Sequence, residues 1–254
     1  MGQNVKVTLP GNPHQLTVRQ HFHTRASIKR FADVRGEVAV LRNGSARASR
    51  RGPNSSCFYA VRAWSERLER SRLFVDIEDR FHEEVGRLVH GGSVRNHRAL
   101  SDYFILWRIK AALARNPLED LELAGITSMG LSQERQEILE SKGLLFVLPG
   151  PRSGNAVVPG RLHSYLHAVR EYDAASETHA SLRWGALRPV GTVRLVCPDR
   201  PEMLFMPLTP RLGVAAGYPD CALDDATTAH VNRLCREQAE RFIFGHPRDV
   251  LDKL

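Results

Sequence analysis

Two histidines lie one residue apart in the most basic part of the sequence. His21 and His23 belong to the stretch RQHFHTRASIKRFAD, residues 19–33. Imidazole exchanges protons near neutral pH, so either side chain is a candidate general acid or base. In an extended segment both would point to the same side, which also suits two metal ligands. Because no spacing marks a third ligand, we assign no metal site, and a divalent metal stays an open alternative.

A glutamate and a lysine on two predicted helices are the next candidates. Glu84 shares one helix face with three apolar residues, Ile77, Phe81 and Leu88. A carboxylate on an apolar stripe needs a partner, because burying it unpaired costs free energy. Lys110 flanks the apolar stripe of the next helix in the same way. We therefore expect Glu84 to pair with Lys110 or with a histidine of the N-terminal segment.

A histidine, a carboxylate and an amine that meet in a polar pocket can act on a phosphodiester. The histidine moves the proton, and the ammonium stabilises the charge that develops on the phosphate. We expect His21 as acid or base, Glu84 as its orienting or metal-binding carboxylate, and Lys110 as charge stabiliser. Secondary candidates for the same site are His23, Glu78 and Asp199. The competing hypothesis is a buried polar network that fixes the basic segment to the helices.

The positive charge of the chain is concentrated near its N-terminus. The 254 residues carry a net charge of +8, and residues 1–72 hold 14 Lys or Arg but only 4 Asp or Glu. A positive charge gathered in one segment is typical of a protein that binds a polyanion. Nucleic acid is therefore the expected partner, with DNA and RNA both open. The predicted phosphate contacts are Arg25, Lys29, Arg30, Arg50 and Arg51.

Arginine dominates the basic residues, with 31 of the 36. Its forked guanidinium recognises phosphate better than a point ammonium does. A GC-rich genome would produce the same excess without any binding role, so the excess alone does not decide. The stretch 42–56, rich in Gly, Ser and Arg, is the best candidate for a basic arm.

Several classes of protein are disfavoured by what the sequence lacks. The longest apolar run, LLFVLP at 144–149, is far shorter than the roughly 20 residues that cross a bilayer. No signal pattern opens the chain, so we expect a cytoplasmic protein without a membrane partner. The four cysteines form no Cys-x-x-Cys pair, and no phosphate-binding loop, dinucleotide fingerprint or nucleophile elbow is present.

The hydrophobic pattern predicts an α+β fold, a mainly helical domain with a small antiparallel sheet formed by N-terminal and C-terminal strands. Helical periodicity predicts helices at about 74–88, 100–111, 132–142, 161–171 and 226–243. Alternating or apolar runs predict strands at 5–9, 36–42, 192–197, 202–208 and 212–217. We expect a single domain over 1–254, in which the loop 149–160 separates the lobes 1–148 and 161–254.

The order of these landmarks resembles a bacterial family, domain-of-unknown-function family 4238. Members open with a His-Tyr-Val-Pro type motif followed by an aliphatic residue and Phe, which corresponds to His21-Phe22-His23-Thr24, Ile28 and Phe31. Downstream, the similar stretches are CFYAV (57–61), IEDRFHEE (77–84), YFILWRIK (103–110) and CPDRPEMLFMPLTPRLGVAA (197–216).

The chain departs from the family pattern at four of these positions. His23 replaces an apolar residue, Thr24 replaces Pro, Trp107 replaces Gln and Lys110 replaces Arg. An apolar residue at the position of His23 implies that this side chain faces a core. His21 is then the better candidate for a functional role, and the two-histidine metal hypothesis weakens.

The family brings no established reaction, and its association with mobile elements and phage defence implies either a nuclease or an accessory protein. Our first hypothesis is a nucleic-acid-acting protein, a nuclease of a defence or toxin type that uses the His/Glu/Lys cluster. The alternative is a non-catalytic nucleic-acid-binding component in which the cluster is structural. A third hypothesis is a protein-binding accessory component whose basic arm meets an acidic partner encoded nearby.

Overall fold

The structure is a computed structural model that describes residues 8–151 and 154–250. Within these residues, helices account for 39% and strands for 20%, and the strands form four separate sheets of two to four strands. The fold is thus mixed α+β, and the expectation of a mainly helical domain with one small sheet was wrong. Most strands have only two to five residues, which is too short for a period of two to stand out in the sequence.

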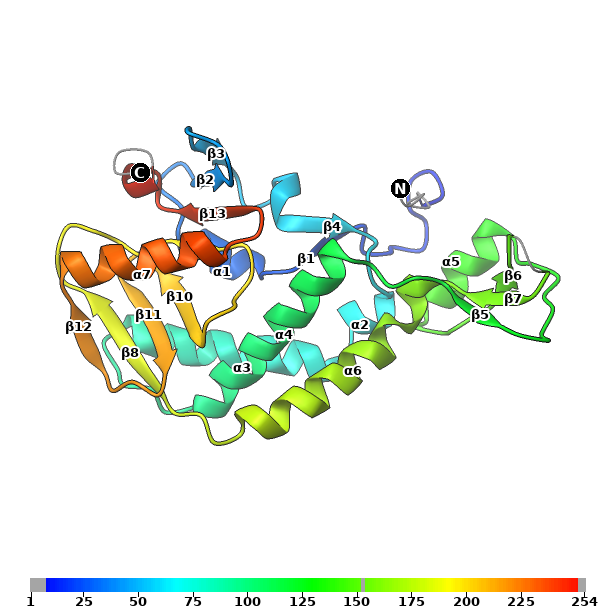
Figure 1. The fold of residues 1–254 in the computed structure, drawn as a ribbon. Coiled ribbons are helices and arrows are strands. Elements are labelled where there is room, and N and C mark those ends of the chain that lie inside the picture. The colour runs from blue at the N-terminus through cyan, green and yellow to red at the C-terminus, as the bar shows by residue number, and fades with distance from the viewer. Residues whose placement is uncertain (1–7, 152–153, 251–254) are drawn as a thin grey trace.

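Three long helices form the centre of the molecule (Figure 1). They are α3 (Arg72–Val89), α4 (His97–Arg115) and α6 (Gly160–His179). The middle helix, α4, is buried along most of its length because α3 and α6 pack against it. The Phe81 and Tyr103 rings stack across the α3–α4 contact with their centroids 3.6 Å apart. This packing fixes the side of α4 that carries Lys110 against α3.

A four-stranded sheet lies at one end of these helices, with α7 (Asp225–Gln238) across it (Figure 1). Its order is β10-β11-β8-β12, with β12 parallel to β8 and the other pairs antiparallel. The strands are β8 (Trp184–Pro189), β10 (Phe205–Thr209), β11 (Leu212–Ala216) and β12 (Cys221–Leu223). Leu187, Phe205 and Leu223 of the sheet pack with Cys235 of α7 in a second apolar cluster.

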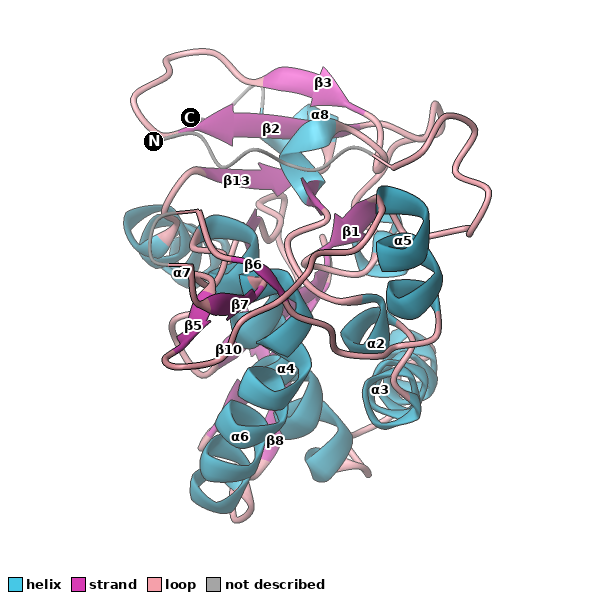
Figure 2. Cartoon of the chain, turned by 90° about the vertical axis from the view of Figure 1, so that its right-hand side faces the viewer, coloured by secondary structure: helices cyan, strands magenta, loops and turns pink. Residues whose placement is uncertain are grey.

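A second four-stranded sheet joins the two ends of the chain. Figure 2 shows β3, β2 and β13 side by side above the helices. In the order of the sheet, the strands are β3 (Ser49–Arg51), β2 (Val38–Arg42), β13 (Phe242–Gly245) and β9 (Cys197–Pro198). The predicted helix 226–243 therefore ends early, because α7 stops at Gln238 and the chain turns into β13. A short helix, α8 (Pro247–Val250), follows β13.

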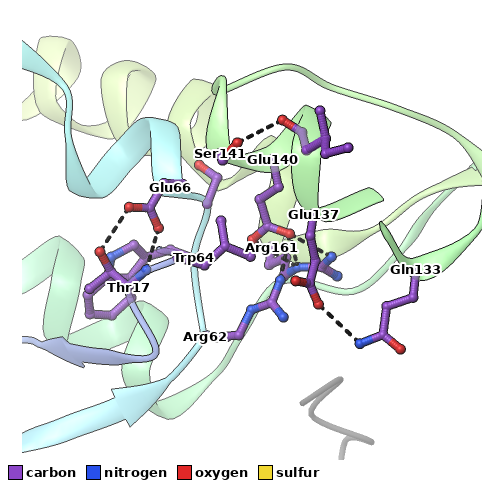
Figure 3. Close-up of polar contacts among 12 residues, drawn as sticks. Thr17, Arg62, Trp64, Glu66, Gln133, Glu137, Glu140, Ser141 and Arg161 are labelled. Atoms are coloured by element: carbon purple, nitrogen blue, oxygen red, sulfur yellow. Dashed lines mark hydrogen bonds and ion pairs between the residues drawn. The ribbon is translucent and has the colours of Figure 1, made fainter. Parts of the chain in front are cut away.

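The residues between α4 and α6 extend away from the centre (Figure 1). They form α5 (Gln133–Ser141) and a three-stranded sheet of β5 (Leu121–Leu123), β6 (Leu148–Pro149) and β7 (Ala156–Val158). Of the loop that we expected at 149–160, Pro149 belongs to β6, residues 156–158 form β7, and Gly160 begins α6. The buried residues of α5 are polar, and Glu140 pairs with Arg62 at 2.7 Å and Arg161 at 2.9 Å (Figure 3).

The N-terminal segment lies over the central helices. It contains β1 (Arg19–His21), α1 (Arg25–Lys29), the 3-10 turn η1 (Ser56–Phe58), β4 (Tyr59–Val61) and α2 (Glu66–Glu69). β1 pairs antiparallel with β4, and the Thr24 side chain caps α1. Of the strand predicted at 5–9, residues 5–7 lie outside the described residues, and Thr8 and Leu9 belong to no strand. Within the described part, no helix is long and apolar enough to cross a membrane.

Candidate functional site

Lys110 is the centre of the candidate site. Its Nζ lies 2.7 Å from Oε1 of Glu78 on α3, and only 7% of the lysine side chain is exposed against 27% of the glutamate. Burial lowers the pKa of Lys110, but the carboxylates of Glu78 and Glu69 outweigh burial and raise the pKa above its usual value. Lys110 therefore carries its positive charge at neutral pH. Its ammonium lies beside the partly exposed carboxylate of Glu78.

Glu84, the predicted partner of Lys110, lies elsewhere. It is buried, as its place on the apolar stripe indicates, but its Oε1 accepts from Arg87 at 2.5 Å and from the Arg95 backbone N–H at 2.8 Å. Burial raises the pKa of Glu84, and these hydrogen bonds outweigh it and hold the pKa below its usual value. Glu84 fixes the turn between α3 and α4, so its assignment to the cluster was wrong. The secondary candidate, Glu78, takes its place.

His21 stands at the end of β1, opposite Tyr59 of β4. Its Nε2 lies 3.1 Å from the Pro53 carbonyl oxygen, which can only accept a hydrogen bond. Nε2 therefore carries a proton, and in the neutral ring Nδ1 holds the free lone pair. Burial lowers the pKa of His21 below 6.5, and the charges of Arg25 and Lys110 lower it further, against the Pro53 hydrogen bond and Glu69. The ring is a base at neutral pH.

Glu69, at the end of α2, is a member of the site that the sequence did not reveal. Its Oε2 accepts a hydrogen bond from Trp64 Nε1 at 2.7 Å, which fixes the carboxylate. The charge of Glu69 raises the pKa of both His21 and Lys110, so its carboxylate lies near enough to both to interact with them electrostatically. Nothing in the spacing of SERLE (65–69) distinguishes this glutamate from an exposed one at a helix end.

We name His21, Glu69, Glu78 and Lys110 the His–Lys cluster. Its members come from β1, α2, α3 and α4, so distant parts of the chain build one site. His21, Glu69 and Glu78 are half-buried, and Lys110 lies beneath them. The cluster combines a base with a free lone pair, a fixed cation and two carboxylates that orient it. This set can take up a proton and stabilise a developing negative charge.

His23 belongs to a neighbouring buried network. Its ring packs on Trp107 with the centroids 4.1 Å apart, and its Nδ1 lies 3.0 Å from the Tyr103 hydroxyl. Burial holds the pKa of His23 well below its usual value, helped by the charges of His82, Arg30 and His21. The side chain faces the core, as the apolar residue of the resembling family implied. His23 is therefore placed to support β1 rather than to meet a substrate.

His82 connects this network to the basic segment. Its Nε2 lies 3.1 Å from Thr24 Oγ1, and its Nδ1 lies 3.1 Å from a guanidinium nitrogen of Arg30. Arg30 can only donate, so Nδ1 accepts and Nε2 carries the proton. Burial lowers the pKa of His82 to about 4, with Arg30 as the second cause. Arg30, a predicted phosphate contact, is thus held against α3.

The other predicted phosphate contacts differ in how freely they face solvent. Arg50 pairs with Asp33 at 2.6 Å and with Glu37 at 3.5 Å, so its charge is largely satisfied within the protein. Arg25 and Lys29 on α1 and Arg51 on β3 are exposed. Arg25 also lies close enough to His21 to lower the pKa of that ring. At least one basic residue, Arg25, therefore lies near the His–Lys cluster. The five predicted phosphate contacts differ in how available they are to bind phosphate.

Asp199, the last candidate, has a structural role. It is buried, and its two oxygens accept from the backbone N–H groups of Glu240 and Arg241 at 3.0 and 3.1 Å. Arg115 and Arg241 add ion pairs at 3.5 Å each. These contacts fix the turn between α7 and β13. They explain why a carboxylate after a strand can look functional in the sequence without belonging to the His–Lys cluster.

No group of three or more His, Cys, Asp and Glu side chains in the described residues is arranged to hold a metal ion. Comparisons with protein-family models, curated proteins and solved structures give no match for this chain. The resemblance to domain-of-unknown-function family 4238 therefore stays a prediction, and the function has to be argued from the site itself.

Proposed function

We propose that this chain acts on nucleic acid and cleaves phosphodiester bonds with the His–Lys cluster, as in a defence or toxin nuclease. The observation that carries the proposal is the buried, charged Lys110 held by Glu78 at 2.7 Å, near enough to the basic imidazole of His21 for its charge to lower the pKa of that ring. A nuclease needs both a proton acceptor and a fixed positive charge within one site. The cluster supplies both, and the exposed residues of α1 supply positive charge beside them.

His21 would act as the general base. Its Nε2–H is occupied by the Pro53 carbonyl, so Nδ1 takes the proton of the attacking hydroxyl or water. As the attacking oxygen bonds to phosphorus, the P–O bond to the leaving oxygen breaks, and the leaving oxygen takes up a proton from solvent. The ammonium of Lys110 would stabilise the negative charge that develops on the phosphate oxygens. Glu78 and Glu69 keep Lys110 protonated and in place, and they act as positioning residues. Arg25 and Lys29 would hold the flanking phosphates.

A non-catalytic role in nucleic-acid binding is the second candidate. The observation that favours it is the burial of Lys110, whose side chain is 7% exposed and whose ammonium is already paired with Glu78 at 2.7 Å. In that case the cluster would fix the N-terminal segment to α3 and α4, and the basic residues would bind without chemistry. A protein partner for the basic segment, a cytoplasmic location and a need for a divalent metal also stay proposals.

Two matched glutamate variants separate these candidates. Glu78→Gln removes the carboxylate that holds Lys110, whereas Glu84→Gln removes a buried carboxylate from the same helix outside the cluster. We expect Glu78→Gln to slow cleavage of labelled DNA or RNA by about 10²-fold while binding changes little. Glu84→Gln is expected to lower stability and to leave the cleavage rate of the folded fraction unchanged.

The assay should be run with both nucleic acids, with added Mg²⁺ and with a chelator. Equal cleavage by both glutamate variants would contradict the assignment of the cluster. Tight binding without cleavage by the unchanged protein under all these conditions would support the non-catalytic candidate.

A further inference from the structure

A basic pocket separate from the His–Lys cluster lies where α2, the start of α3 and the end of α5 meet. Its volume is about 350 Å³, within the range of small-molecule sites. Its walls carry four cations, which are Arg67, Arg70, Arg72 and Lys142. They also carry the hydroxyl-bearing residues Ser71, Ser141 and Tyr165 and one carboxylate, Glu66. This composition suits an anion that accepts several hydrogen bonds.

The carboxylate of Glu66 does not neutralise this pocket. Its Oε2 accepts from the Thr17 backbone N–H at 2.8 Å, and its Oε1 accepts from the Thr17 hydroxyl at 2.9 Å (Figure 3). The same Oε1 pairs with Arg70 Nε at 2.6 Å. Glu66 therefore uses its charge within the protein and balances only one of the four cations. The Asp76 carboxylate, 3.7 Å from Arg72 Nε, partly balances a second cation. Arg67 and Lys142 leave the pocket with a net positive charge.

Two of the cations are held in position by the protein. The Arg67 guanidinium lies over the Tyr165 ring, 4.5 Å from its centroid. A second nitrogen of Arg70 donates to the Gln15 carbonyl at 2.8 Å. Guanidinium groups fixed in this way lose little conformational entropy when they bind a phosphate.

The chain also brings α5 unusually close to these cations. Gly143, just after α5, has a φ of +70°, and a Cβ at this position would lie 3.2 Å from Arg67 Cβ. A glycine is therefore needed for both the turn and the close approach. Ser71 precedes α3 and makes no side-chain cap hydrogen bond to the helix. It lines the pocket, so its hydroxyl adds a donor to the same wall.

We propose that this pocket binds a phosphate group, either the terminal phosphate of a nucleic acid or that of a free phosphate compound. Phosphate matches the pocket because it offers several acceptor oxygens to forked guanidinium donors. The proposal stands without the cleavage chemistry above, since none of the lining residues belongs to the His–Lys cluster. It adds a second anion site to the predicted contacts of the N-terminal segment.

Isothermal titration calorimetry of the full chain tests the proposal with three probes. These are pyrophosphate and one short oligonucleotide prepared with either a 5′-phosphate or a 5′-hydroxyl. The test variants are the double substitution Arg67→Gln with Lys142→Gln, and Arg72→Gln, whose side chain is 94% exposed, so that its substitution is expected to change stability little. The matched control is Arg236→Gln on α7, which removes one exposed charge elsewhere.

We expect pyrophosphate to bind the unchanged protein and the control, and to bind the double variant at least about tenfold more weakly. Preference for the 5′-phosphorylated oligonucleotide, lost in the double variant, would assign the pocket to nucleic acid. Equal affinity for both oligonucleotides, together with pyrophosphate binding, would assign it to a free phosphate compound. If the unchanged protein shows neither pyrophosphate binding nor a 5′-phosphate preference, or if the control loses as much as the variants, the proposal is wrong. None of these results depends on cleavage activity.

Discussion

At the scale of single residues, two groups set the chemistry of the site. Lys110 keeps its charge although it is buried, because Glu78 and Glu69 face it. His21 stays neutral at pH 7, because burial and two nearby cations lower its pKa. A positively charged ammonium, which can stabilise negative charge, and a neutral imidazole base are therefore present together at neutral pH. That coexistence is what the cleavage proposal needs.

The protonation of His21 predicts the pH dependence of cleavage. The base form is lost only as the pH falls through the lowered pKa, so the rate should be flat near neutrality and decrease below pH 6.5. Measurement of single-turnover rates from pH 4.5 to 8 checks this expectation, with buffers of about equal ionic strength. A rate that rises on acidification through this range would show that His21 is not the base.

The half-buried His82 predicts a pH dependence of stability. Its pKa is about 4 in the folded protein, against the usual 6.5 in an unfolded chain. Between these values the unfolded chain binds the extra proton, so the free energy of unfolding decreases as the pH falls through this window and is fully regained above it. His82→Gln should lose less stability than the unchanged protein between pH 7.5 and 5.

Urea unfolding at the two pH values measures this difference. His90→Gln is the control, because His90 is exposed at the end of the same helix. If His82→Gln and His90→Gln show the same pH dependence as the unchanged protein, His82 is not responsible.

At the scale of elements, the α3–α4 contact positions the His–Lys cluster. Phe81 is almost fully buried and stacks on Tyr103, whose hydroxyl reaches His23. Phe81→Ala should lower the free energy of unfolding by about 3–5 kcal/mol, because it leaves a cavity between the two helices. Val75→Ala, at an exposed position of α3, should cost far less. Denaturant unfolding compares the two variants, and similar losses would contradict this account.

The attachment of α5 depends on buried charge. Glu140 is nearly inaccessible and pairs with Arg62 and Arg161 (Figure 3). Glu140→Ala leaves both arginines without this partner and should destabilise the segment from β5 to β7 by about 3–5 kcal/mol. Hydrogen exchange should then be faster in residues 121–158 than in α3. Glu134→Ala, on the exposed side of α5, is the control, and equal exchange in the two variants would contradict the prediction.

The elements also show what the sequence could and could not predict. Long amphipathic stripes predicted α3 and α4 to within a few residues, because their apolar faces repeat over several turns. Phe242 continued the period of α7, so the predicted helix ran to residue 243, although pairing with β2 makes Phe242–Gly245 a strand. Periodicity also showed that Glu84 is buried but not which partner it meets. The partners of Glu84 are Arg87, in the last turn of α3, and the backbone N–H of Arg95, in the connection to α4.

At the scale of the whole molecule, the basic residues differ in their availability to a polyanion. Arg50 is already paired with Asp33 and Glu37, whereas Arg25, Lys29 and Arg51 are exposed. Each of Arg25→Gln, Lys29→Gln and Arg51→Gln should therefore reduce the slope of log K against log salt by about 1 for duplex DNA. Arg50→Gln should reduce it by less. Fluorescence anisotropy at several salt concentrations measures the slopes, and a larger effect of Arg50 would contradict the ranking.

The most direct test of the central claim is single-turnover cleavage by Lys110→Met, measured beside nucleic-acid affinity. Met keeps most of the side-chain volume of Lys110 and removes the positive charge that we propose stabilises the phosphate. We predict a rate about 10²–10³-fold below that of the unchanged protein, with affinity nearly unchanged. Cleavage by Lys110→Met at the unchanged rate would contradict the account, because the fixed cation would then take no part in the reaction.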